Sequence, residues 1–147
     1  MIKGILFDLD GVLVDAPVWH QEAFNKALVA CGYESTTKEY HDTYLNGLGT
    51  PEKLRKMGID EWDVDIINYK KQLITKEIIN ERCVDDPFKR DVLKYAASVA
   101  KIALVTNCSR ETALMLLEKA GLRKELKVIV TANEVRKKKP SPIPYRQ

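Results

Sequence analysis

The stretch ILFDLDGVLVD, residues 5–15, decides the fold, because it joins an apolar, strand-like run to two carboxylates. Asp8 and Asp10 follow Phe7 at once, and Gly11 comes directly behind them. Two residues apart on an extended chain, the two side chains lie on the same side, about 7 Å from each other. Gly11 lets the backbone turn and can bring the second carboxylate closer. Because such like charges repel, the spacing indicates a site that needs both of them.

Two more apolar, β-branched runs predict buried strands, KIALVT at 101–106 and LKVIVTA at 126–132, in addition to the first run at 2–8. None of the three alternates strictly with polar residues, so we expect a sheet covered on both faces. Between the last two runs, Leu114, Leu117 and Ala120 recur at helical spacing, and Gly121 stands at the position of a C-terminal cap. Strand, helix, strand predicts a right-handed parallel crossover and therefore an α/β fold.

The segment between the first two strands is different in kind. Pro17 can begin a helix that ends near Gly32, and residues 61–82 continue in helical register without a convincing strand. A structureless loop of about this length is uncommon, so we expect an inserted helical domain. The predicted domains are an α/β core over residues 1–15 and 85–147 and a helical cap over residues 16–84.

Composition and charge exclude several classes of protein. The chain has 147 residues, 45% hydrophobic and 31% charged, which is typical of a globular domain. The net charge of +3 and the short basic run at 136–139 do not indicate a nucleic-acid partner. No apolar run approaches about 18 residues, so we expect no membrane partner. Three widely spaced cysteines, Cys31, Cys83 and Cys108, suggest neither disulfides nor a zinc site and favour a cytoplasmic location.

The predicted strand ends carry the parts of a phosphoryl-transfer site. In a parallel sheet, ligands gather outside the carboxyl ends of the strands. The first strand delivers Asp8 and Asp10, a possible nucleophile and a possible proton carrier. The second delivers Thr106 and backbone amides at the start of a helix, a natural anion site, and Lys139 follows the third. A Mg²⁺ ion between Asp8 and the phosphate would resolve the repulsion of the two carboxylates.

Three motifs, FDLDGVLVD, LVTNCSR and KKKPSP, resemble the first three motifs of the haloacid dehalogenase-like hydrolase superfamily, in particular its phosphoglucomutase-like phosphatase branch. The resemblance implies a HAD-like, Rossmannoid parallel sheet with an inserted all-helical cap, and Mg²⁺ as cofactor. It implies that Asp8 forms a phosphoaspartate, and that Asp10 is the general acid/base, with its backbone carbonyl on the metal. Thr106 then supplies the phosphate-binding hydroxyl, with the Asn107 backbone beside it. Lys139 matches the third-motif lysine.

The sequence also departs from the family pattern. The family's fourth motif, which supplies a further acidic metal ligand, does not occur before Gln147, and Glu134 lies in what resembles the link to the third motif. We therefore expect a core truncated at its C-terminus, with an open apolar sheet edge and an uncovered core face. Such a chain would be a fragment of a longer protein or a truncated form with a compensating interaction or another role.

The cap residues bear on the reaction. His20 matches a cap histidine that lies over the active site in the mutase relatives, and we take it as a candidate substrate-binding residue. Ala16 and Thr50 replace a threonine and a phosphate-gripping arginine of the mutase, so hydrolysis is favoured. The leading hypothesis is a Mg²⁺-dependent phosphatase of a small phosphorylated metabolite. The alternatives are a non-catalytic phosphate-binding or regulatory protein and, less favoured, a phosphosugar mutase.

Each candidate also has a purely structural interpretation. Asp10 could simply cap the turn at Gly11, and Thr106 and Asn107 could be an ordinary strand end and turn. Lys139 could be one more solvated lysine of a basic run, and His20 an ordinary residue of a cap helix.

Overall fold

A computed structural model describes residues 2–147 and contains one parallel sheet of three strands. The strands are β1 (Gly4–Phe7), β2 (Lys101–Val105) and β3 (Val128–Val130), in the order β1-β2-β3. Their register aligns Leu6 with Ala103 and Ala103 with Val128. The predicted α/β class and the parallel pairing of the strands are confirmed.

Two helices connect and cover these strands, α5 (Pro87–Val99) before β2 and α6 (Arg110–Lys119) after it. A side chain caps the N-terminus of each helix by accepting a hydrogen bond from a backbone amide. Asp86 accepts from the Lys89 amide in α5, and Ser109 accepts from the Thr112 amide in α6. Gly121 follows α6 with a φ of +70°, the left-handed conformation predicted for its cap. Short 3₁₀ turns complete this part of the chain at Arg123–Glu125 and Ile143–Arg146.

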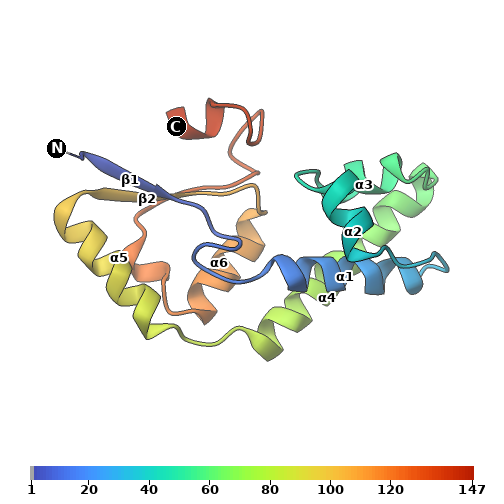
Figure 1. Cartoon of the computed structure of the whole chain (residues 1–147), viewed down its shortest axis with the longest axis horizontal. Coiled ribbons are helices and arrows are strands. Elements are labelled where there is room, and N and C mark those ends of the chain that lie inside the picture. The colour runs from blue at the N-terminus through green and yellow to red at the C-terminus, as the bar shows by residue number, and fades with distance from the viewer. Residues whose placement is uncertain (1) are drawn as a thin grey trace. The chain divides into compact units, whose positions relative to one another are not determined.

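Both α5 and α6 lie below the sheet in Figure 1, on one face. This is the expected consequence of two successive right-handed crossovers that step in the same direction. Leu6 and Val128, in one row of the register, are each 53% exposed. The expectation of a sheet covered on both faces is therefore wrong for the described residues, because the connections place their helices on a single face.

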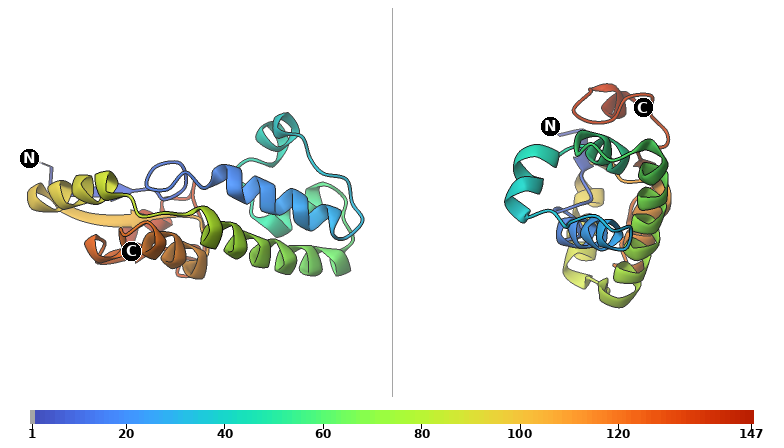
Figure 2. Two further views of the ribbon diagram at one scale, coloured as in Figure 1. Left: turned by 90° about the horizontal axis from the view of Figure 1, so that it is seen from below. Right: turned by 90° about the vertical axis from the view of Figure 1, so that its right-hand side faces the viewer.

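The inserted segment is helical, and residues 8–100 contain no strand longer than an isolated bridge. It contains α1 (Pro17–Val29), α2 (Lys38–Tyr40), a π-helical turn (His41–Leu45), α3 (Thr50–Lys56) and α4 (Glu61–Arg82). Helices α1 and α4 run side by side in both views of Figure 2. Their facing side chains form a buried core with the π-helical turn and α3: Phe24, Ala27, Leu28, Leu45, Leu54, Val64 and Ile67.

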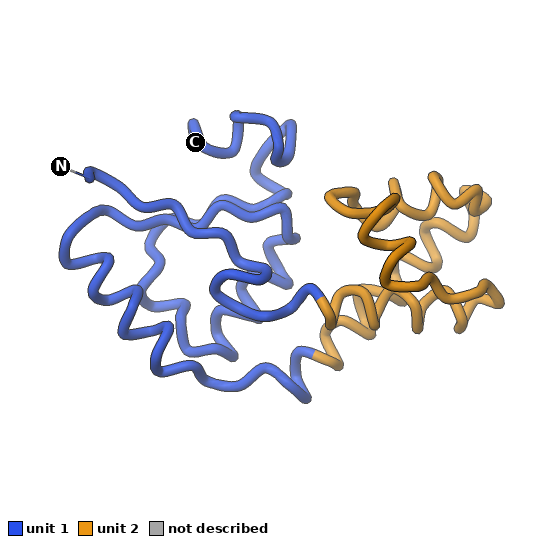
Figure 3. Tube along the Cα trace, viewed as in Figure 1, with its two compact units in different colours: residues 1–17, 79–147 blue, residues 18–78 orange. Residues whose placement is uncertain are grey.

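The chain divides into two compact units, shown in Figure 3. Unit 1 comprises Met1–Pro17 and Ile79–Gln147, and unit 2 comprises Val18–Ile78. Helix α4 begins in unit 2 and ends in unit 1. Within the part of the chain that the structure describes, no helix has the length and apolar character needed to cross a membrane.

Candidate active site

The loop after β1 presents the two aspartates. The Asp8 carboxylate Oδ1 accepts a hydrogen bond from the backbone amide of Leu9 at 2.8 Å. The chain then turns tightly: the Leu9 carbonyl accepts from the Val14 amide, and the Gly11 amide donates to the Val14 carbonyl at 2.7 Å. Gly11 has a φ of +77°, a conformation that a residue with a Cβ rarely adopts. The glycine therefore allows the turn that holds Asp10 next to the strand end.

Lys139 provides the counter-charge for Asp8. Its ammonium nitrogen lies 2.8 Å from Asp8 Oδ1 and donates a second hydrogen bond to the Val105 carbonyl at 3.0 Å. The Lys139 side chain is 17% exposed, whereas Lys137 and Lys138 are exposed residues. A cation held at the end of β2 thus offsets part of the repulsion between the aspartates. Among the three lysines, Lys139 has the position expected of a site residue.

Asn107 ties the loop after β2 to the loop after β3. Its side-chain amide donates to the Lys139 carbonyl at 3.0 Å and accepts from the Lys139 backbone amide at 2.9 Å. The sequence predicted a contribution from the Asn107 backbone, and the structure adds this side-chain role. Because both bonds go to the main chain of Lys139, Asn107 positions the lysine that pairs with Asp8.

Thr106 lies at the carboxyl end of β2 and is 3% exposed. Its amide donates to the Val130 carbonyl at 2.9 Å, which continues the pairing with β3. Its hydroxyl accepts from the Cys108 amide at 3.0 Å, and its own hydrogen can still be donated. The structure thus places Thr106 at the strand end, with its hydroxyl in the turn that begins α6.

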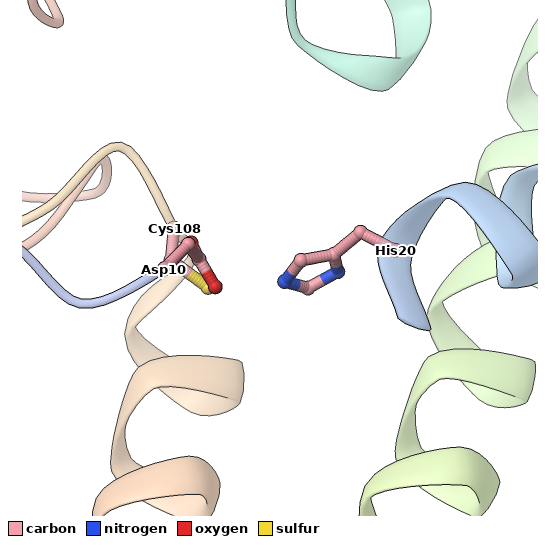
Figure 4. A group of neighbouring side chains, drawn as sticks. All are labelled: Asp10, His20 and Cys108. Atoms are coloured by element: carbon pink, nitrogen blue, oxygen red, sulfur yellow. The ribbon is translucent and has the colours of Figure 1, made fainter. Parts of the chain in front are cut away.

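Cys108 is a neighbour of the site that the sequence did not reveal. Its sulfur and a carboxylate oxygen of Asp10 lie within 4.8 Å of each other. Figure 4 shows the two side chains together at the ends of their loops, with His20 carried by a separate helix. A lone cysteine after an asparagine carries no pattern that predicts this proximity; only the pairing of β1 with β2 creates it.

Glu134 takes part in closing the loop after β3. Its carboxylate accepts from the amide and the hydroxyl of Thr131 and pairs with Arg110 at 2.9 Å. Burial raises the pKa of Glu134, but the hydrogen bonds from Thr131 and the Arg110 pair outweigh it and hold the pKa below its usual value. Nearby, the side-chain oxygen Oδ1 of Asn133 accepts a hydrogen bond of 2.8 Å from the backbone amide of Arg110, the first residue of α6.

His20 lies on α1 in unit 2, where basic side chains gather. Its Nδ1 is 3.4 Å from the ammonium of Lys71, a residue that is 8% exposed. In the same unit, Lys53 Nζ lies 2.7 Å from His41 Nε2. Burial and the charge of Lys71 lower the pKa of Lys53 to about 8. Burial and the charge of Lys53 likewise lower the pKa of His41. This environment favours an anion over another cation.

The donor set at the strand ends suits a hard divalent cation. Asp8 and Asp10 offer carboxylate and carbonyl oxygens, the ligands that Mg²⁺ prefers. The described residues of unit 1 that surround them add a thiol and an ammonium, neither of which is a usual magnesium ligand. The residues present therefore fit Mg²⁺ through a small number of protein oxygens, an arrangement in which water and substrate oxygens complete the coordination.

The fold and the polar groups gathered at the carboxyl edge of its parallel sheet are those of an α/β enzyme. A sequence model described as haloacid dehalogenase-like hydrolase matches residues 5–147, so the chain belongs to this family. The predicted family and fold, including the inserted helices, are thereby confirmed.

Two sequence relatives and one solved structure match nearly the whole chain. A phosphorylated carbohydrates phosphatase of Thermotoga maritima is 27% identical over 153 residues, 98% of this chain and 68% of that protein. A phosphoglycolate phosphatase of Nitrosospira multiformis is 30% identical, over 97% of this chain and 66% of the relative. A crystal structure of CbbY from Rhodobacter sphaeroides with xylulose-(1,5)bisphosphate has a TM-score of 0.84 at 25% identity, covering 99% of this chain and 70% of CbbY. The chain spans about two thirds of the length of these relatives.

Proposed function

We propose that this protein is a Mg²⁺-dependent phosphatase that hydrolyses a small phosphorylated metabolite through a phosphoaspartate at Asp8. The observation that carries the proposal is the pairing of Asp8 with Lys139, 2.8 Å apart, at the carboxyl edge of the sheet. A carboxylate nucleophile needs a neighbouring cation to approach an anionic phosphate, and Lys139 supplies one. The relatives named above act on or bind phosphorylated small molecules, which supports the substrate class.

The reaction would proceed in two displacements at phosphorus. In the first, a carboxylate oxygen of Asp8 attacks phosphorus, the bond to the ester oxygen breaks, and Asp10 gives its proton to the departing alkoxide. In the second, Asp10 takes a proton from water as the water attacks phosphorus, and the bond to Asp8 breaks to release inorganic phosphate. Lys139, together with the Thr106 hydroxyl and neighbouring amides, would stabilise the charge on the phosphoryl oxygens.

The metal would be held by the Asp8 carboxylate and the Asp10 backbone carbonyl. When bound, Mg²⁺ would neutralise charge on the phosphoryl oxygens and keep the Asp8 carboxylate ionised. Lys139 already pairs with the Asp8 carboxylate and would remain a second positive charge beside it. The Asp10 carboxyl group would carry the proton, because only the Asp10 backbone carbonyl would take part in metal binding.

We also propose that residues 16–84 act as the substrate-choosing cap and that His20 contributes to substrate binding from this domain. The basic surroundings of His20, with Lys71 close by, support an anionic substrate group. The three cysteines form no disulfide, which supports a reducing, cytoplasmic environment for the protein.

The direct test is release of phosphate from an aryl phosphate by the 147-residue chain, with and without Mg²⁺. Asp8→Asn and Asp10→Asn should each lower the rate at least about a hundredfold, and Lys139→Met should do so as well, because each removes a group used in the displacement. Lys137→Met removes an exposed lysine two residues away and should leave the rate unchanged. No release above the Asp8→Asn blank, from folded protein, would contradict catalysis and favour a phosphate-binding role.

A further inference from the structure

Four basic side chains of unit 2 form a cluster to which each helical element contributes one member. They are His20 from α1, His41 from the π-helical turn, Lys53 from α3 and Lys71 from α4. All four lie within residues 18–78, so the cluster belongs to unit 2 alone (Figure 3). Cations gathered in one place raise each other's energy, so a cluster of this kind is stabilised when an anion joins it.

Short contacts join the four side chains. The ammonium nitrogen of Lys53 lies 2.7 Å from His41 Nε2 and 5.7 Å from the centre of the Phe24 ring. The rings of Phe24 and His41 pack edge to face, with their centroids 6.1 Å apart. One helical turn before Phe24 on α1, His20 Nδ1 lies 3.4 Å from the ammonium of Lys71, and the charge of Lys71 acts on Lys53. The two lysines therefore belong to one electrostatic environment.

The Lys53 ammonium has donor capacity that the fold does not use. His41 Nδ1 lies 3.8 Å from the carboxylate of Asp42, which favours the tautomer with its hydrogen on Nδ1. His41 Nε2 then accepts one of the three ammonium hydrogens of Lys53. Among the described residues, His41 is the one hydrogen-bond partner of this ammonium. Two hydrogens of Lys53 are therefore left for an acceptor that the chain does not supply.

Lys53 is also a cation that no acid compensates. Burial and the positive charge of Lys71 lower the pKa of Lys53 from 10.5 to about 8, and neither of these influences is an acidic neighbour. Asp42, the carboxylate nearest to His41, is paired with Lys38. The side chain of Lys71 is 8% exposed, so water screens its charge poorly. An anion beside the two lysines would offset both the burial and the repulsion.

We propose that Lys53 and Lys71 are the charged ligands of an anion site in unit 2 that binds a phosphate group. Two ammonium groups match a ligand that carries up to two negative charges and several acceptor oxygens, which describes phosphate better than a carboxylate. The phosphate can be free inorganic phosphate or a phosphate group carried by a metabolite. None of the groups proposed for the displacement at Asp8 belongs to this site, so its existence does not depend on the proposed reaction.

NMR of the 147-residue chain with isotope-labelled lysine, titrated with inorganic phosphate, tests this proposal. The pKa of Lys53, read from its ε-carbon, should rise from about 8 toward its ordinary value of 10.5 when phosphate binds, because the anion offsets the charge of Lys71. Lys71→Met should weaken phosphate binding at this signal at least about tenfold, since it removes a charge-assisted hydrogen bond. The signal is local, so it reports on this site even where phosphate also binds near Asp8.

Lys70→Met is the matched control, because it removes the same charge at the neighbouring position of α4. The Lys70 ammonium lies 3.1 Å from the Ala30 carbonyl, just after the end of α1 and ten residues, or about 15 Å, from His20. This variant should leave phosphate binding unchanged, and circular dichroism verifies that each variant is folded. A Lys53 pKa that stays the same in a large excess of phosphate would overturn the proposal. Equal weakening by Lys70→Met and Lys71→Met would also overturn it.

A pair of esters distinguishes the two sources of the phosphate group. Hexanediol bisphosphate and hexyl phosphate are compared in Asp8→Asn protein, with and without Lys53→Met, by calorimetry. Tighter binding of the bisphosphate that Lys53→Met abolishes would support the site and assign it to a phosphate group carried by a metabolite. Equal binding of the two esters, with the Lys53 pKa still raised by inorganic phosphate, would support the site and assign it to free phosphate. Neither measurement requires turnover, so an inactive chain would leave this test intact.

Discussion

Replacing Asn107 by alanine tests how the loop that carries Lys139 is held in place. The change removes two hydrogen bonds, of 2.9 and 3.0 Å, between the Asn107 side chain and the main chain of Lys139. Each is worth about 0.5–1.5 kcal/mol, and both are solvent-exposed, so values near the lower end apply. We expect the free energy of unfolding to fall by about 1–2 kcal/mol. The amide of Lys139 loses its acceptor, and its exchange with solvent should quicken about 5–30-fold.

Hydrogen exchange followed by NMR measures this effect at the residue concerned. Asn133→Ala is the matched control, because its side chain accepts a single hydrogen bond, from the Arg110 amide, and does not touch Lys139. That variant should leave exchange of the Lys139 amide unchanged. An unchanged exchange rate for this amide in Asn107→Ala would refute the tethering role, and so would an equal rise in both variants.

Three further changes test packing, capping and electrostatics. Leu28→Ala should lower the free energy of unfolding by about 2–5 kcal/mol in urea titrations, because Leu28 is fully buried in the unit 2 core. Ser109→Ala should lower the free energy of unfolding by about 0.5–2 kcal/mol in the same assay, because it removes the side chain that accepts a hydrogen bond from the Thr112 amide and caps α6. The Lys53 pKa of about 8 lies below its ordinary value of 10.5. The unfolded chain therefore binds more protons between these values, and stability should rise across this pH range. Lys53→Met should abolish the rise.

Much of the fold could be predicted because its strands are short apolar runs bounded by polar residues. The C-terminal end of α6 could be predicted from Gly121 and the start of α1 from Pro17, because both residues have strong backbone preferences. Helix α5 was not predicted, although Asp86 and Pro87 mark its start. Its apolar residues divide between a buried side and an exposed stripe, and this double pattern obscures the single face that helical periodicity usually reveals.

The site was predictable where residues are close in sequence and less so where folding joins distant loops. Asp8 and Asp10 could be predicted as site residues from their spacing and from the glycine that follows them. Lys139 could be distinguished from the lysines before it only by resemblance to the family, and the structure places it against Asp8. The side-chain bonds of Asn107 and the approach of Cys108 to Asp10 depend on the pairing of strands, which no local pattern encodes.

The central claim is that Asp8 receives the phosphoryl group. The most direct measurement is mass spectrometry of peptides from protein that is incubated with an aryl phosphate and Mg²⁺ and then quenched in acid. The mechanism predicts a phosphoryl group on the peptide that contains Asp8, absent from Asp8→Asn and from samples without Mg²⁺. Release of phosphate with no labelled Asp8 peptide, or with the label on another residue, would contradict it.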